Sequence, residues 1–272
     1  MAAKVHVSYP APGVGLLVLD NPPKNFGSYE LLQELENGLA EARAKRCLAV
    51  VLASDLPGYL MAHAWLPDVI NAYDDPTKIS GDPLLWRRVT NELERGPYVT
   101  ISANHAQAWG GGAELSWACN LRTATPEATY AQIEVALGVI PGGGGTVRLS
   151  RLVGQSKAME IMLSGEPLTA EELYRVGGVN RLWPAEELRE RTIEWAALIA
   201  SRPRRAVLAN KRGLLQTWDL DQENALRLEG YIFNSCMVPE EIERFRMIQA
   251  RYDAGQDSWD AYDLPRERSG RP

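Results

Sequence analysis

The first half of the chain alternates between unbroken apolar runs and segments whose apolar residues recur every three or four positions. Val14–Leu19 and Leu48–Ala53 are unbroken runs, which is typical of strands covered on both faces of a sheet. The segment between them, residues 29–43, has helical spacing of its leucines, namely Leu32, Leu35 and Leu39. Further short strands are predicted at 99–103, 121–124 and 129–132, and a helix at 114–119. This order of strand, helix and strand predicts an α/β core.

After about Gln155 the strand pattern ends and helical spacing takes over. Helices are predicted at 157–163, 169–176, 185–200, 204–218, 222–233 and 240–252. Thr169 is followed three residues later by Glu172, which predicts a capping box. We therefore expect two parts, a core that carries the site over residues 1–200 and a helical C-terminal region with a tail over residues 201–272.

Composition narrows the class of protein without identifying its function. The 272 residues are 45% hydrophobic and 24% charged, as in ordinary globular proteins. A net charge of −6 argues against a general nucleic-acid surface. No stretch approaches the length of a membrane span and MAAKVHVSYP lacks the apolar core of a signal peptide, so we expect a cytoplasmic protein without a membrane partner. The three cysteines form no CxxC pair, so neither a disulfide framework nor a zinc ribbon is predicted.

Two glycine-rich segments, each beside an acid in an apolar stretch, carry the candidate chemistry. Gly110–Gly112 precede a predicted helix that holds Glu114, and Pro141–Thr146 (PGGGGT) follow Glu134. Glycines before a helix let a ligand come close and leave N–H groups for a phosphate or a developing oxyanion. Two carboxylates in apolar surroundings can share one water and handle a proton addition and a proton removal.

The residues alone leave a structural interpretation of these acids open. Each carboxylate would then cap a helix or pair with an arginine such as Arg122 or Arg148. The glycine pattern does not decide the matter, because it is not GxGxxG and no Lys-Ser/Thr pair follows it. A P-loop is therefore not predicted.

Residues 104–153 resemble the crotonase superfamily, the enoyl-CoA hydratases and isomerases. The resemblance is carried by GGGxEL, an acid about twenty residues later, and then LGxxPGxGGTxRL. It extends through LDNPPKN, LTAEELYRVGGVNRLWP and ANKRGLL, over roughly residues 14–215. It implies a spiral α/β core of repeated strand-strand-helix turns, and a helical trimerisation region from Arg204 onward. It also implies an acyl-CoA thioester substrate in fatty acid metabolism, no metal or redox cofactor, and a homotrimer or homohexamer.

The resemblance also assigns roles to single residues. Ala64 and Gly111 would donate backbone N–H groups to the thioester oxygen, forming an oxyanion hole. Glu114 would orient and activate a water that adds at C3 of an enoyl-CoA, and Glu134 would give the proton to C2. Lys24 would meet the nucleotide part of coenzyme A. The full set of substrate-binding positions that the resemblance implies is Lys24, Ala62, His63, Trp65, Gly110, Pro141 and Gly142.

One loop departs from the family pattern, which is usually Gly-Ala-Asp and here reads His63-Ala64-Trp65. His63 either acts as an acid/base group beside the carbonyl or only shapes the loop. Trp65 replaces an acid and is expected to narrow or shield the acyl pocket. Asn120 stands where the family often has aspartate, which changes a structural hydrogen bond.

The presence of both glutamates favours a hydratase, since isomerases of the family generally keep only the later acid. Three alternatives use the same scaffold: an isomerase, other enolate chemistry such as C–C hydrolysis or decarboxylation, and a non-catalytic protein that binds acyl-CoA. The fold does not separate them.

Overall fold

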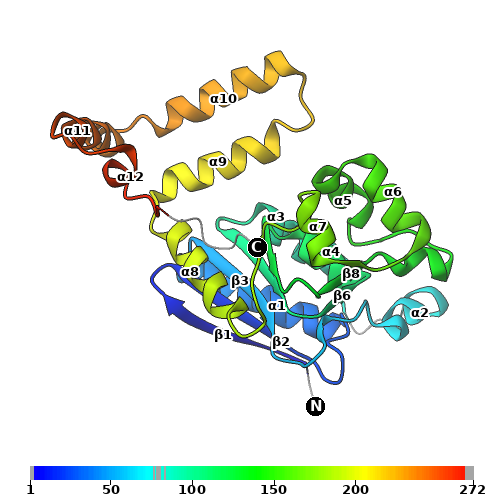
Figure 1. The fold of residues 1–272 in the computed structure, drawn as a ribbon. Coiled ribbons are helices and arrows are strands. Elements are labelled where there is room, and N and C mark those ends of the chain that lie inside the picture. Colours follow the sequence, from blue (N-terminus) through cyan, green and yellow to red (C-terminus); the bar gives the residue numbers. More distant parts are fainter. Residues whose placement is uncertain (1–2, 76, 78–80, 83, 267–272) are drawn as a thin grey trace. The chain divides into compact units, whose positions relative to one another are not determined.

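In the computed structural model, which describes residues 3–75, 77, 81–82 and 84–266, the chain divides into two units (Figure 1). The first unit ends at Ser201 and holds both sheets. The second begins at Arg202 and consists of helices and their connections.

The larger sheet of the first unit has six strands in the order β1-β2-β3-β5-β7-β10. Their bounds are β1 Lys4–Ala11, β2 Val14–Asp20, β3 Ala49–Ser54, β5 Val99–Asn104, β7 Leu121–Ala124 and β10 Arg181–Leu182. Only β1 and β2 pair antiparallel, and the others pair parallel. Strand β3 is buried along its whole length and β2 as far as Leu19, which explains the two unbroken apolar runs of the sequence.

The smaller sheet has the order β4-β6-β8-β9. Its bounds are β4 Tyr59–Met61, β6 Gln107–Trp109, β8 Thr129–Ala131 and β9 Leu168–Thr169. Strands β4, β6 and β8 pair parallel, and each follows a strand of the larger sheet along the chain. Each pair of strands is then followed by helices, so the chain repeats strand-strand-helix turns. The predicted spiral core is confirmed.

Helices cover both faces of the larger sheet. Alternate residues of each strand point to opposite faces, so a strand such as β2 packs against helices on both sides. Leu17 and Leu19 of β2 pack in one apolar cluster with α1, α3 and α4, whereas Leu16 and Val18 pack with α8. The helices of the unit are α1 Tyr29–Ala44, α2 Leu66–Asp74, α3 Leu85–Arg95, α4 Gly111–Ala118, the 3-10 helix η2 Ile133–Leu137, α5 Gly145–Val153, α6 Gln155–Ser164, α7 Ala170–Arg175 and α8 Leu188–Ala200.

Most predicted elements lie within three residues of the observed ones. The capping box is present: the Thr169 side chain accepts from the Glu172 N–H, and the Glu172 carboxylate accepts from the Thr169 N–H. The sequence pattern did not predict β1, the three-residue strands β4 and β6, the two-residue strands β9 and β10, the 3-10 helix η2, or the helices α2, α3, α5 and α12. Helix α4 also begins three residues earlier than predicted, at Gly111.

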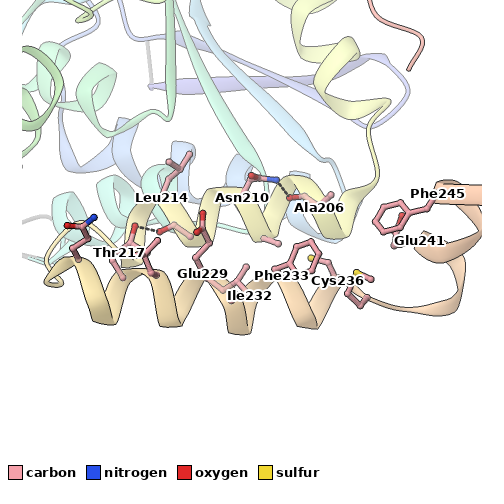
Figure 2. A pocket seen from close by; sticks show the side chains of 17 residues that line it. Ala206, Asn210, Leu214, Thr217, Glu229, Ile232, Phe233, Cys236, Glu241 and Phe245 are labelled. Atoms are coloured by element: carbon pink, nitrogen blue, oxygen red, sulfur yellow. Dashed lines mark hydrogen bonds between the residues drawn. The ribbon is translucent and has the colours of Figure 1, made fainter. Parts of the chain in front are cut away.

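The second unit is built from α9 Arg204–Gln216, α10 Gln222–Cys236, α11 Pro239–Asp253 and α12 Ser258–Ala261. A cavity of about 750 Å³ opens between α9, α10 and the start of α11 (Figure 2). Leu214, Phe233 and Phe245 line it, with Ile232 beneath. Ile232 is the one buried side chain that the structure describes in α9, α10 and α11.

Candidate active site

The glycines that precede Glu114, Gly110–Gly112, place the start of α4 against β4. Gly110 has φ +48°, a conformation that favours glycine, and its N–H donates to Ala131 O at 2.8 Å. A Cβ on Gly112 would collide with the backbone oxygen of Met61. Glycine is therefore required here so that the first turn of α4 can press against the loop that follows β4.

That loop presents the N–H of Ala64 toward Gly111. Gly27 N–H donates to His63 O at 2.8 Å, and Trp65 N–H donates to Gly27 O at 3.0 Å. Because these flanking bonds point to Gly27, the Ala64 N–H points the other way. A Cβ on Gly111 would lie 3.1 Å from Ala64 N. Within the described part of the chain, neither the Ala64 nor the Gly111 N–H donates to a protein acceptor.

Glu114 of α4 is buried, with 4% of its surface exposed. Its Oε1 accepts from Gly143 N–H at 2.6 Å and from Gly145 N–H at 2.9 Å. Burial raises the pKa of Glu114 to about 7, and the charge of Glu134 adds to the rise, although the two N–H groups and Arg148 oppose it. Its Oε2 accepts no hydrogen bond from the described residues.

Glu134 lies in η2 and is oriented by a buried glutamine. Gln132 Nε2 donates to both carboxylate oxygens of Glu134, at 3.3 and 3.1 Å. The amide of Gln132 is fixed in turn, because Trp117 Nε1–H donates to its Oε1 at 3.0 Å. A Cβ on Gly110 would lie 3.3 Å from Glu134 Oε1. The structure thus brings Glu134 to the start of α4, where Glu114 lies one turn further on.

The structural interpretation of the acids is right in one respect. Glu114 accepts from Gly145, the first residue of α5. Neither acid forms an ion pair with an arginine among the described residues: Arg122 donates to backbone oxygens such as Cys119 O, and Arg148 pairs with Glu94. Glu114 therefore keeps one oxygen to which no described residue donates.

The other predicted substrate-binding residues differ in their burial and in the residues that they contact. Ala62 is buried, and its N–H donates to Lys24 O at 3.0 Å, while the ammonium of Lys24 lies 5.8 Å from the Tyr59 ring centroid. Trp65 is 39% exposed and packs on Phe26, with ring centroids 5.1 Å apart.

His63 takes the place of the usual glycine without a left-handed backbone, since it is not among the described residues with positive φ. Its Nδ1 lies 2.6 Å from Ala64 O, and its Cβ lies 3.3 Å from where a Cβ on Gly110 would be. The Cβ of His63 and the Glu134 carboxylate therefore both lie beside Gly110.

In the second glycine segment, the residues that donate to Glu114 are neighbours of the two residues that were predicted. Gly142 is exposed, and Pro141 packs beside Gly145. The contacts to Glu114 come from Gly143 and Gly145.

Sequence reasoning missed Gln132 and Trp86. Gln132 stands two residues before Glu134, a spacing that could have marked it as a partner. The ring edge of Trp86, from α3, lies between two glycines: a Cβ on Gly111 would be 2.6 Å from Cη2, and a Cβ on Gly27 would be 2.8 Å from Cζ2. No sequence motif predicts this contact.

Asn120 makes structural hydrogen bonds, accepting from Thr100 N–H at 3.0 Å and donating to Glu94 O at 2.9 Å. In the described ranges, no three His, Cys, Asp or Glu side chains gather where they could hold a metal ion. None of the helices described there is both long and apolar enough to cross a membrane.

Comparison with known proteins points in one direction. The family described as enoyl-CoA hydratase/isomerase matches residues 11–259. A probable enoyl-CoA hydratase of Rhizobium meliloti (strain 1021) is 31% identical over 242 residues, which cover 84% of this chain and 88% of that protein. The crystal structure of an enoyl-CoA hydratase from Bacillus anthracis matches with a TM-score of 0.84 and 28% identity, covering 91% of this chain and 96% of that one.

A longer relative is a glyoxysomal fatty acid beta-oxidation multifunctional protein, MFP-a, of Brassica napus. It is 34% identical over 198 residues, which are 71% of this chain but only 27% of that protein. The chain thus spans about a quarter of the length of this relative.

Proposed function

Because the chain belongs to the enoyl-CoA hydratase/isomerase family, as the motifs around Glu114 and Glu134 predicted, we propose that it is an enoyl-CoA hydratase. The observation that carries the proposal is the pairing of two carboxylates, from α4 and η2, beside two backbone N–H groups that have no acceptor among the described residues. Such a set is suited to adding water across the 2,3 double bond of an enoyl-CoA thioester.

The N–H groups of Ala64 and Gly111 act as the oxyanion hole in this proposal. The thioester oxygen sits between them, and negative charge moves onto it as water adds at C3. Gly111 is the first residue of α4, so the positive end of the helix dipole favours the same charge. Fixed donors aimed at a developing oxyanion lower the barrier without reorganising during the reaction.

Two protons move in the reaction, one from the water to Glu114 and one from Glu134 to C2. A return transfer from Glu114 to Glu134 by way of water restores both groups. The Glu114 carboxylate accepts a proton from the water as the water oxygen bonds to C3. Its Oε2 supports this role, because it has no donor among the described residues. Glu134 then gives its proton to C2 of the enolate, and Gln132 holds the carboxyl group in place.

The experiment that tests this function is a panel of trans-2-enoyl-CoA substrates of increasing chain length. Hydration is followed by loss of the conjugated thioester absorbance, and by mass, as the gain of one water. Glu114→Gln and Glu134→Gln should each lower the rate by about 10²–10⁴-fold with the fold retained, since each removes a proton-transfer group. Wild-type protein that hydrates no member of the panel contradicts the proposal. Tight binding without turnover would instead support the non-catalytic alternative.

We also propose that the second unit forms the contact of a homotrimer or homohexamer. Helices α9 to α11 bury only Ile232 among their described side chains and leave Leu214 at 75% and Phe233 at 57% exposure. Three helices with so little core do not stabilise one another alone. The cavity along α9 and α10 (Figure 2) is apolar enough to receive another copy of the chain.

The exposed Lys24, whose backbone oxygen binds the loop before Ala64, is proposed to meet the nucleotide part of coenzyme A. A cytoplasmic location, and a reaction that needs no metal or redox cofactor, also remain proposals.

A further inference from the structure

The loop that holds Glu114 consists of four consecutive glycines, Gly142–Gly145. Glycine loses more backbone freedom on ordering than any other residue, and these residues have no side chains with which to pack. Gly143 and Gly145 nevertheless bind Glu114 Oε1 at 2.6 and 2.9 Å. Whatever fixes this loop therefore also fixes the carboxylate.

Arg148 of α5 reaches back to the loop. Its Nη1 donates to Gly143 O at 2.8 Å, so one glycine accepts from Arg148 and donates to Glu114. A Cβ on Gly144 would collide with the same guanidinium nitrogen. Gly144 also has a left-handed φ of +102°, a conformation that by itself favours glycine.

Glu94 of α3 holds Arg148 from the other side. Nε and Nη2 of Arg148 donate to the two oxygens of Glu94 at 3.3 and 3.2 Å, and Nη2 also donates to Asn91 Oδ1 at 3.2 Å. The side chains of Arg148 and Glu94 are only 11% and 17% exposed. Helix α3 and the loop line one cavity of about 280 Å³, and Arg148 joins its two walls. A bidentate arginine–carboxylate pair fixes the orientation of the guanidinium better than a single hydrogen bond does.

We propose that Arg148, held by Glu94, is a positioning residue that fixes the glycine loop and thereby aims the carboxylate of Glu114 at the attacking water. This inference rests on the proposed hydratase function. Arg148 also supplies a positive charge that favours the ionised form of Glu114, the form that accepts the proton of water.

The charges around Glu114 fix the sign of the expected pH effect. Arg148 lowers the pKa of Glu114, and Glu134 raises it. Glu94 partly offsets Arg148, and His63 borders the site from the loop after β4. Removing Arg148 should raise the pKa of Glu114 above about 7, whereas removing the charge of Glu94 should lower it.

The test compares Arg148→Met, Arg148→Lys and Glu94→Gln, with Arg151→Met as the control. Arg151 lines the same cavity one turn further along α5, so its replacement removes an equal charge. Arg148→Met should lower kcat about 10- to 100-fold with KM within about threefold, because the charge-assisted bond to Gly143 O is lost together with the pairing to Glu94, and the thioester donors are untouched. As the pH is lowered, its kcat/KM should begin to fall at a higher pH than that of the wild type. Arg148→Lys should keep the wild-type pH profile but lose part of kcat, because it keeps the charge without the fork.

Glu94→Gln should lower kcat and move the acid limb of kcat/KM to lower pH, opposite to Arg148→Met. Arg151→Met should keep both kcat and the limb of the wild type. The titration of Glu114, followed by carboxyl-carbon NMR and assigned with Glu114→Gln, should show the same opposite shifts without any substrate.

Two results overturn the inference: a kcat unchanged in Arg148→Met, or an unshifted Glu114 titration in both Arg148→Met and Glu94→Gln. An equal effect of Arg151→Met also overturns it. If Arg148→Met does not fold, Arg148→Lys and Glu94→Gln decide the matter. A wild type that hydrates nothing rejects the proposed function alone, since the NMR titration still tests the position of Arg148.

Discussion

Burial of Glu114 places a carboxylate where its charge is costly. The group is 4% exposed and its pKa is raised from 4.5 to about 7. Between these two values the folded protein keeps a proton that the unfolded chain has released. This contribution therefore favours folding at low pH and is lost as pH rises from about 4.5 through 7. At the residue scale, Glu114 reduces the free energy of unfolding under neutral to alkaline conditions.

Glu114→Gln should accordingly be more stable than the wild type at pH 8. We expect a gain of about 1–3 kcal/mol in the free energy of unfolding, because a neutral amide removes the buried charge and still accepts from Gly143 and Gly145. The gain should shrink toward pH 4.5. Urea unfolding at both pH values measures it, with the exposed Glu127→Gln as control. A variant less stable than the wild type at pH 8 would contradict the expectation.

Gly111→Ala should stop catalysis by filling the space between Trp86 and Ala64. Its Cβ would lie 2.6 Å from Trp86 Cη2 and 3.1 Å from Ala64 N. We expect hydration to fall more than about 100-fold, since one oxyanion donor is blocked, and stability to fall by about 1–3 kcal/mol from overpacking. The double variant Gly111→Ala/Trp86→Phe should regain stability but not rate, as thermal melts and initial rates would show.

The control is Gly230→Ala, where a Cβ meets nothing within 4 Å; because Gly230 lines the cavity of the second unit, the assembly of this variant is measured as well. Full activity of Gly111→Ala would show that the space beside Ala64 is not where the thioester binds.

At this scale the sequence indicates the proposed catalytic groups more directly than the residues that hold them in place. Gly111, Glu114 and Glu134 belong to one contiguous motif with fixed spacing, so a resemblance finds them. Arg148 and Glu94 lie 54 positions apart and meet only because α3 faces the glycine loop. Their pairing depends on the packing of two helices, and no spacing in the sequence encodes it.

At the element scale, a buried asparagine ties the turn after β2 to the strands beside the site. Asn25 Nδ2 donates to Ser54 Oγ at 2.7 Å and to Leu60 O at 3.0 Å, and its Oδ1 accepts from Asn21 N–H at 2.7 Å. Asn25 is fully buried and has φ +49°, a conformation that asparagine tolerates better than most residues. The neighbouring Lys24 O then accepts from Ala62 N–H, so the turn reaches the loop before Ala64.

Asn25→Ala should therefore destabilise the protein by about 2–4 kcal/mol, because buried partners lose their bonds and alanine is strained at positive φ. Surviving folded protein should hydrate more slowly, since the Ala64 loop loses part of its support. Urea unfolding and initial rates measure the two effects. The exposed Asn37→Ala serves as control. A loss below about 1 kcal/mol would mean that the turn is held by other contacts.

Short elements escaped the sequence patterns for a physical reason. Strands β4 and β6 have three residues each, too few to show a period of two. Helix α2 has no buried residue, so its apolar side chains follow no core-facing stripe. By contrast α1, with sixteen residues and a buried leucine face, was predicted to within one residue.

At the scale of the whole molecule, the helices of the second unit require a covering surface. Their apolar side chains line a cavity of about 750 Å³, while their described core amounts to Ile232 in α9 to α11. The sequence predicted these helices from periodicity. It could not show what covers them, because periodicity reports a face and not its partner.

Wild-type protein should sediment as a trimer or hexamer, and Leu214→Glu or Phe233→Glu should shift it toward smaller species. Each substitution places a charge in the apolar cavity, where its desolvation opposes association. Arg227→Glu, on α10 but outside the cavity lining, should keep the wild-type assembly. Sedimentation velocity at several concentrations distinguishes these outcomes, and a wild-type monomer would contradict the proposed contact.

The parallel order of the strands also has a consequence for how the protein is made. Consecutive members of β3-β5-β7 and of β4-β6-β8 are joined by long crossovers and not by hairpins. Such a chain has a high contact order, so the entropy of closing its loops is lost before native contacts compensate, and folding is slow. Ala64, Gly111 and Glu134 come from three successive turns of the spiral, so no early fragment holds a partial site. During refolding, activity should return only when both sheets are complete. Until then, the unpaired strand edges of the partly folded chain should make it prone to aggregation.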